Sequence, residues 1–100
     1  MIQEAAIRTR HPYYADIENI RKRMKRIEGQ AKGIQRMLDE DRYCIDIVQQ
    51  LTALSKAADE VAMIIMENHI EGCVSHAIRE QHGAPYIKEL MATIRKTLKR

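Results

Sequence analysis

Two residues that can bind a soft metal ion stand one helical turn apart in a stretch without proline. In "ENHIEGC", residues 67–73, His69 and Cys73 are four positions apart, and the other cysteine is Cys44. Two thiolates and one imidazole form a soft donor set that favours Cu(I), with Zn(II) as the usual competitor. Three ligands suit trigonal Cu(I), whereas a structural Zn(II) site normally has four. These residue types therefore indicate a Cu(I) site.

A long second helix is expected from about Tyr43 to about Cys73, because no proline interrupts this stretch and its first glycine is Gly72. At about 100° per residue, Cys44 lies within about 20° of both His69 and Cys73 around the helix axis. The same face carries small and aliphatic residues, which are typical of a close contact between two helices: Val48, Leu51, Ser55, Ala58, Ala62 and Ile65. The three candidate ligands therefore lie on a packing face.

One chain cannot bring these ligands to the same ion, because a continuous helix separates Cys44 from Cys73 by roughly 44 Å. An antiparallel pair of second helices removes this difficulty. A two-fold axis near Ala58 places Cys44 of one chain beside His69 and Cys73 of its copy. We predict a dimer with two identical intersubunit sites. The alternative for each residue alone is structural: a small buried cysteine, or a helix histidine with an ordinary partner.

The remaining elements are also predicted to be helical. A first helix begins after Asp16 as N-cap and carries an apolar heptad stripe: Ile17, Ile20, Met24, Ile27, Ala31, Ile34 and Leu38. A polar link follows at 39–42, and a third helix runs from about Pro85 to Leu98. Gly29 and Gly33 indicate either a close neighbouring helix or glycines that the first helix tolerates.

The composition supports an all-α protein. The chain has 100 residues and 45% hydrophobic content without Phe or Trp, which suits a helical core rich in aliphatic side chains. So short a chain buries little of its surface, and its apolar stripes need a partner. We therefore predict a three-helix protomer that forms an antiparallel helical-bundle dimer. Residues 1–15 are expected to form a flexible N-terminal extension and residues 16–100 a single all-helical domain.

Basic residues gather toward both ends of the chain around an acidic centre, with a net charge of +3. "RKRMKR", residues 21–26, places five bases in six positions on the first helix. Such a row can contact DNA phosphates, with an affinity that falls as salt rises. The alternative is an ordinary solvated helix face. A separate recognition helix is not expected, because the helices are long and their links short.

The location of the protein and the absence of an enzyme active site are also expected from sequence. The N-terminal residues lack the apolar core of a signal peptide, and no run approaches the roughly 18 apolar residues that span a bilayer. We expect a cytoplasmic protein that does not bind a membrane. Two cysteines in a reducing compartment are ligands, redox groups or small hydrophobes rather than a structural disulfide. We find no nucleophile elbow, phosphate loop or carboxylate pair and expect no enzyme.

The stretch "IRKRMKRIEGQAKGIQRMLDEDRYC" followed by "HIEGC" resembles the CsoR family of metal-responsive bacterial repressors, over roughly residues 17–95. The resemblance implies all-helical dimers that pair into tetramers and an intersubunit metal site. Cys44, His69 and Cys73 match the Cys-His-Cys set of the family's Cu(I) sensors. The family's nickel/cobalt sensors have His in place of Cys73 and use an N-terminal His, and its sulfur sensors lack the His.

The resemblance also implies roles for residues outside this set. Tyr43 and Glu89 fall where the Cu(I) sensors have residues that link the bound His to the rest of the bundle. Arg23 matches a DNA-binding arginine of the family, and we extend that role to Arg21, Lys22 and Lys25. One departure is His11, close to where nickel/cobalt sensors take their extra ligand. His76 and His82 are read as surface histidines.

We therefore predict a Cu(I)-responsive transcriptional repressor whose apo oligomer binds operator DNA and whose Cu(I)-bound form releases it. The direction of this coupling comes from the resemblance, since the residues alone also permit co-repression. The alternatives are a nickel/cobalt-sensing repressor, a thiol redox or reactive sulfur sensor, and a copper buffer or chaperone that binds no DNA.

Overall fold

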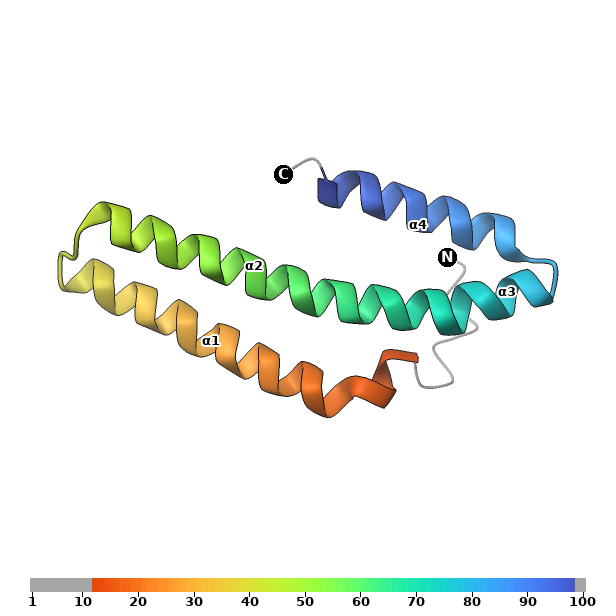
Figure 1. Cartoon of the computed structure of the whole chain (residues 1–100), viewed down its shortest axis with the longest axis horizontal. Coiled ribbons are helices and arrows are strands. Elements are labelled where there is room, and N and C mark those ends of the chain that lie inside the picture. Colours follow the sequence, from red (N-terminus) through yellow and green to blue (C-terminus); the bar gives the residue numbers. More distant parts are fainter. Residues whose placement is uncertain (1–11, 99–100) are drawn as a thin grey trace. The chain divides into compact units, whose positions relative to one another are not determined.

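The computed structural model describes residues 12–98, all of whose regular structure is helical (Figure 1). The elements in chain order are a 3-10 helix η2 (Pro12–Asp16), α1 (Ile17–Asp39), α2 (Cys44–His69), a π-helix η3 (Ile70–Val74), α3 (Ser75–Arg79) and α4 (Gly83–Leu98). Because α2, η3 and α3 follow one another without a break, the described chain has three main helical segments. This confirms the prediction of an all-α, three-helix protomer.

α1 begins where the sequence predicts, with Asp16 at the N-cap, but the side chain of Asp16 makes no capping hydrogen bond. The 3-10 helix η2 runs directly into α1 and supplies the preceding turn. The predicted extension at 1–15 lies mostly outside the described residues, apart from the start of η2. Its boundary at residue 15 stays a prediction.

A tight turn joins α1 to α2 directly before Cys44. The backbone N–H of Arg42 donates to the Met37 carbonyl (2.9 Å), and the N–H of Asp41 donates to the Leu38 carbonyl (3.2 Å). Asp41 has φ 54°. This pair of bonds with a left-handed residue is a Schellman motif, which satisfies carbonyls at the end of a helix. The turn therefore ends α1 shortly before Cys44, the first residue of α2.

Residues 16–64 form one compact unit, in which α1 and the first part of α2 run antiparallel (Figure 1). Its buried side chains are Ile20, Ile34 and Val61. A Cβ at Gly29 would meet nothing within 4 Å, and one at Gly33 only the end of the Arg36 side chain at 3.7 Å. The neighbouring helix that these glycines suggested is therefore not found within the described residues of one chain.

The prediction of one α-helix to Cys73 is wrong beyond His69. α2 ends at His69, and Ile70–Val74 is π-helical. The backbone N–H of Ser75 donates to the Ile70 carbonyl five residues earlier, and its Oγ–H donates to the same carbonyl at 2.9 Å. A π-turn holds more residues than an α-turn and is often found at functional sites. The helical rotation between His69 and Cys73 therefore differs from that of an α-helix.

Residues 12–15 and 65–98 form the second unit. Its core is Val74 and Ala77, each 4% exposed, where η3 and α3 pack with α4. A second Schellman turn ends α3, with hydrogen bonds from His82 to Ala77 (2.6 Å) and from Gln81 to Ile78 (3.0 Å). α4 begins at Gly83, two residues before the predicted Pro85.

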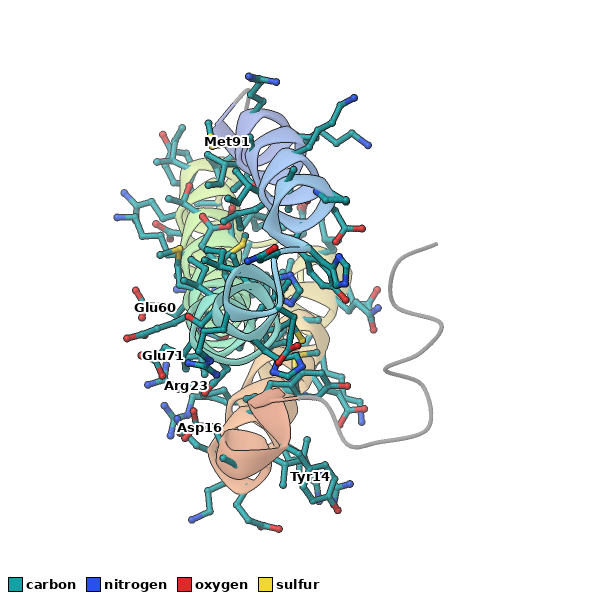
Figure 2. All side chains as sticks on the ribbon, turned by 90° about the vertical axis from the view of Figure 1, so that its right-hand side faces the viewer. Tyr14, Asp16, Arg23, Glu60, Glu71 and Met91 are labelled. Atoms are coloured by element: carbon teal, nitrogen blue, oxygen red, sulfur yellow. The ribbon has the colours of Figure 1, made fainter. Side chains whose placement is uncertain are left out.

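The structure leaves one face of α2 uncovered. We call this the Cys44 face, and it consists of Cys44, Val48, Leu51, Ser55, Ala58, Ala62 and Ile65. All but the half-buried Ile65 are exposed, with Val48 55% and Leu51 47% accessible. Elsewhere, Tyr14 and Met91 project from η2 and α4 (Figure 2). Between residues 12 and 98, no helix has the length and apolar character needed to cross a membrane.

Candidate metal centre

Cys44 is the first residue of α2 and an exposed free cysteine. Its neighbour Tyr43 accepts a hydrogen bond from the N–H of Ile47 (3.2 Å) through its carbonyl and leaves its side chain 66% exposed. The thiol is therefore available on the Cys44 face, held at a fixed point by the turn before it. Both residues belong to the unit of residues 16–64.

His69 is the last residue of α2 and is half-buried. Its imidazole contacts the ring of Tyr86 on α4, with a centroid distance of 6.4 Å and an angle of 33° between the ring planes. The sequence-based reasoning missed Tyr86. An aromatic residue at the start of a predicted helix gives no signal by itself, because its contact with His69 depends on the turn between α3 and α4.

Cys73 lies within η3 as a half-buried free thiol. Burial raises the pKa of this thiol above its ordinary value, and the carboxylate of Glu89 raises the pKa further. Burial and the neighbouring carboxylate both raise the pKa because each disfavours the negative charge of the thiolate. Glu89 therefore acts directly on one candidate ligand, whereas the resemblance placed it beside His69.

The π-turn changes how His69 and Cys73 are aligned. In an α-helix, four residues rotate about 40° past a full turn. Since η3 has more residues per turn, the same four positions rotate less than they would in an α-helix. Gly72, a weak helix former, is the only signal in the sequence that pointed to an irregularity here.

The structure brings some of the predicted residues together and leaves others apart. His69, Cys73 and Glu89 share the unit of residues 65–98 with Tyr86, whereas Cys44 and Tyr43 belong to the other unit. Among the described residues, no group of three or more Cys, His, Asp or Glu side chains is assembled for a metal. One chain thus offers the half-buried pair of His69 and Cys73, which needs a further donor. Soft sulfur and imidazole donors fit Cu(I).

The predicted DNA-binding residues all lie in the first half of α1. Arg21, Lys22 and Lys25 are exposed, whereas Arg23 is half-buried. The Nε–H of Arg23 donates to Oδ1 of Asn19, one turn earlier, at 3.3 Å. This bond uses one donor of the guanidinium and leaves its two terminal NH₂ groups for an anion.

An all-helical chain with a basic first helix and a soft pair of metal donors defines a class of metal-responsive, DNA-binding proteins. The chain belongs to the family of metal-sensitive transcriptional repressors, whose model matches residues 16–96. This confirms the resemblance seen in the sequence. The family consists of transcriptional repressors rather than enzymes, which confirms the expectation that the chain is not an enzyme.

Relatives and a solved structure support this assignment. The chain is 40% identical over 89 residues to the copper-sensing transcriptional repressor CsoR of Bacillus subtilis strain 168, covering 89% of this chain and 88% of that protein. It is 41% identical over 75 residues to the copper-sensing repressor RicR of Mycobacterium tuberculosis strain H37Rv, covering 75% and 76%. The crystal structure of the copper-sensing repressor CsoR with Cu(I) from Geobacillus thermodenitrificans NG80-2 matches with a TM-score of 0.79 and 46% identity, covering 84% of this chain and 88% of that one.

Proposed function

We propose that this chain is a Cu(I)-responsive transcriptional repressor that acts in the cytoplasm as a homodimer or homotetramer on operator DNA. The observation that carries the proposal is the mostly apolar and exposed Cys44 face of α2, a helix that has candidate ligands, Cys44 and His69, as its first and last residues. The relatives named above are copper-sensing repressors, which favours Cu(I) over Ni(II) or Co(II). His11, the candidate extra ligand of a nickel/cobalt site, lies outside the described residues.

In the proposed dimer, the Cys44 faces of two chains pack antiparallel about a two-fold axis near Ala58. Cys44 of one chain then lies beside His69 and Cys73 of its copy, so each end of the helix pair holds one complete ligand set. When bound, Cu(I) supplies a link between the two chains, made by two thiolates and one imidazole. Tyr43, which precedes Cys44, is brought to the same end.

The DNA-binding surface in this proposal is the basic part of α1, with Arg21, Lys22, Arg23 and Lys25 contacting phosphates. α1 is joined to Cys44 by the Schellman turn at Asp41, so a change at the start of α2 reaches α1 through a short, hydrogen-bonded connection. Cu(I) and DNA then oppose each other with a coupling of about 1–3 kcal/mol, and DNA must weaken Cu(I) binding equally.

A thiol redox sensor uses the same two cysteines. Reactive sensor thiols have a lowered pKa, because the thiolate is the nucleophile. Burial and Glu89 raise the pKa of Cys73 instead. This direction makes the Cys73 thiol less reactive toward oxidants at neutral pH.

An anaerobic Cu(I) titration of the reduced apo protein against a competing chelator tests the metal site, with Ni(II) and Zn(II) alongside. We expect one Cu(I) per chain, bound most tightly of the three metals. Cys44→Ala and Cys73→Ala should each abolish tight binding, and mixing these two variants should restore part of it in heterodimers. His76→Ala is the matched control and should bind normally. Binding that survives the loss of either cysteine contradicts the intersubunit site.

DNA binding is tested separately by fluorescence anisotropy, with a fragment from upstream of the gene for this chain. We expect the apo protein to bind, Cu(I) to release it, and affinity to fall steeply with salt. Arg23→Ala should weaken binding and reduce the slope of log affinity against log salt by about 0.9, as for one lost phosphate contact. Lys56→Ala on α2 is the control and should change neither the affinity for DNA nor its dependence on salt. Copper binding without DNA binding at any salt concentration indicates a buffer or chaperone.

A further inference from the structure

The contact between His69 and Tyr86 lies beside the proposed metal site but has no role in the ligand set. The rings are 6.4 Å apart between centroids and tilted by 33°, within the roughly 4.5–7 Å range of paired aromatic rings. Both side chains are half-buried. The imidazole therefore has a neighbouring ring on α4 at the same point where it must present one nitrogen to a metal.

The turn between α3 and α4 places Tyr86 there. The Schellman turn ends α3, and a Cβ at Gly83 would lie 2.7 Å from Cγ1 and 3.2 Å from Cα of Ile78. Only glycine allows so close an approach, since real Cβ contacts are essentially never that short. α4 therefore starts directly against the end of α3, and its first turn carries Tyr86 to the end of α2.

A second contact on the same face of α4 supports the placement. Glu89 is three residues after Tyr86 and therefore on the same side of α4. Its carboxylate acts electrostatically on Cys73, while Tyr86 contacts His69. η3 and α4 are also in direct contact along the backbone. α4 thus meets both members of the His69–Cys73 pair, and the ring contact belongs to a continuous packed surface.

We propose that Tyr86 is a positioning residue whose ring restricts rotation of the His69 imidazole and so holds its metal-binding nitrogen toward the intersubunit site. A histidine at the end of a helix can otherwise turn about two side-chain bonds, and a ligand that must be ordered on binding loses affinity. Because the neighbouring ring is aromatic and tilted, its contact limits rotation without using a ring nitrogen. The proposal rests on the function proposed above.

The first test uses the apo protein and needs no metal. With the histidine rings selectively ¹³C-labelled, we expect Tyr86→Ala to remove the ring-current shift of His69 and to increase the mobility of its ring in ¹³C relaxation. Tyr86→Phe should preserve both, because it keeps the aromatic face. Ile87→Ala, on the exposed side of α4, is the matched control. An unchanged His69 ring in Tyr86→Ala overturns the proposal.

The second test is a double-mutant cycle read by Cu(I) affinity. Tyr86→Ala should weaken Cu(I) binding roughly three- to tenfold, the range expected from a lost aromatic pair, and Tyr86→Phe should restore it. In a His69→Ala background, Tyr86→Ala should have no further effect, since Tyr86 acts through His69. An equal loss in both backgrounds means a general structural role and overturns the proposal.

The two tests separate this inference from the proposed function. If the wild-type protein lacks a tight Cu(I) site that depends on Cys44 and Cys73, the proposed function fails, and the apo measurements still decide whether Tyr86 orders His69. If Cu(I) binds as expected and Tyr86→Ala leaves both ring and affinity unchanged, only the role of Tyr86 fails.

Discussion

At the scale of single residues, Cys73 shows how the fold sets the chemistry of a candidate ligand. Its thiol lies in a π-turn, partly shielded from water, with the carboxylate of Glu89 close enough to repel the thiolate. Both effects keep the thiol protonated to a higher pH than usual. A metal that binds Cys73 must therefore displace this proton, and oxidants and alkylating agents, which react with the thiolate, attack Cys73 more slowly at neutral pH.

Removing the charge of Glu89 should lower the pKa of Cys73. In a Cys44→Ser background, which leaves one thiol, we expect Glu89→Gln to move the pH profile of iodoacetamide alkylation to lower pH. The profile should stay above that of a free thiol, because burial remains. Stopped alkylation followed by mass spectrometry measures the rates. Glu67→Gln, also an acid-to-amide change, is the control, and an equal shift in that variant contradicts a specific effect of Glu89.

Sequence reasoning identified the chemical types at this site but only part of its surroundings. The face shared by Cys44 and His69 could be predicted from helical periodicity, because α2 is α-helical between them, whereas Cys73 lies in η3, which departs from that period. Tyr86 could not, since its contact with His69 depends on the α3–α4 turn. Likewise, the effect of Glu89 on Cys73 depends on packing between η3 and α4 rather than on local sequence.

At the scale of elements, the helices were predictable and their ends less so. The bounds of α1 and α4 agree with the predicted helices to within about two residues, because apolar periodicity and a proline mark them. The π-turn at Ile70–Val74 was not predictable, since its one weak helix former, Gly72, does not distinguish a π-turn from an α-turn. Both Schellman turns also have non-glycine residues, Asp41 and Gln81, at positive φ.

Asp41→Gly should stabilise the turn before Cys44. Asp41 has φ 54°, a left-handed conformation that costs most residues about 1 kcal/mol and glycine almost nothing. We expect a gain of about 0.5–1 kcal/mol in the free energy of unfolding, measured by urea denaturation at fixed protein concentration. The same change at Asp39, the last residue of α1, should give no such gain, because Asp39 has a helical conformation in which glycine is the weaker helix former. A loss of stability in Asp41→Gly indicates that the carboxylate makes a compensating contact.

Gly83→Ala and Gly29→Ala should have opposite effects. The new methyl group at position 83 would overlap Cγ1 and crowd Cα of Ile78, so we expect a loss of about 1–3 kcal/mol. At position 29 it meets nothing within 4 Å, and we expect a gain of about 0.5–1 kcal/mol from higher helix propensity. Urea denaturation of both variants measures these changes in the free energy of unfolding. Destabilisation by Gly29→Ala would show that a second chain approaches α1 there.

At the scale of the whole molecule, the small buried core and the exposed Cys44 face both indicate that the chain needs a partner on this face. The core side chains of the described chain are few: Ile20, Ile34, Val61, Val74 and Ala77. Val48 and Leu51 are meanwhile about half exposed on α2. In the proposed dimer, a second chain on this face would bury that apolar surface, which stabilises by about 25 cal/mol per Å², and would in the same step supply the missing ligand. Stability and metal binding are therefore expected to depend on the same interface.

Ala58→Glu tests this dependence, because the proposed two-fold axis near Ala58 would bring residue 58 of each chain close to its own copy. The substitution would place two carboxylates near each other in a closely packed apolar interface, where an unpaired charge is costly. We expect the variant to sediment as a smaller species in analytical ultracentrifugation and to lose tight Cu(I) binding, although both cysteines and His69 are intact.

Gln49→Glu is the matched control, since it adds the same charge to an exposed position about 180° away around α2. It should assemble and bind Cu(I) as the wild type does. If Ala58→Glu becomes monomeric and still binds one Cu(I) per chain tightly, the ligand set lies within one chain and the intersubunit arrangement is wrong. If it remains fully assembled, the chains associate through another surface, and the ligands at the two ends of α2 must be brought together differently.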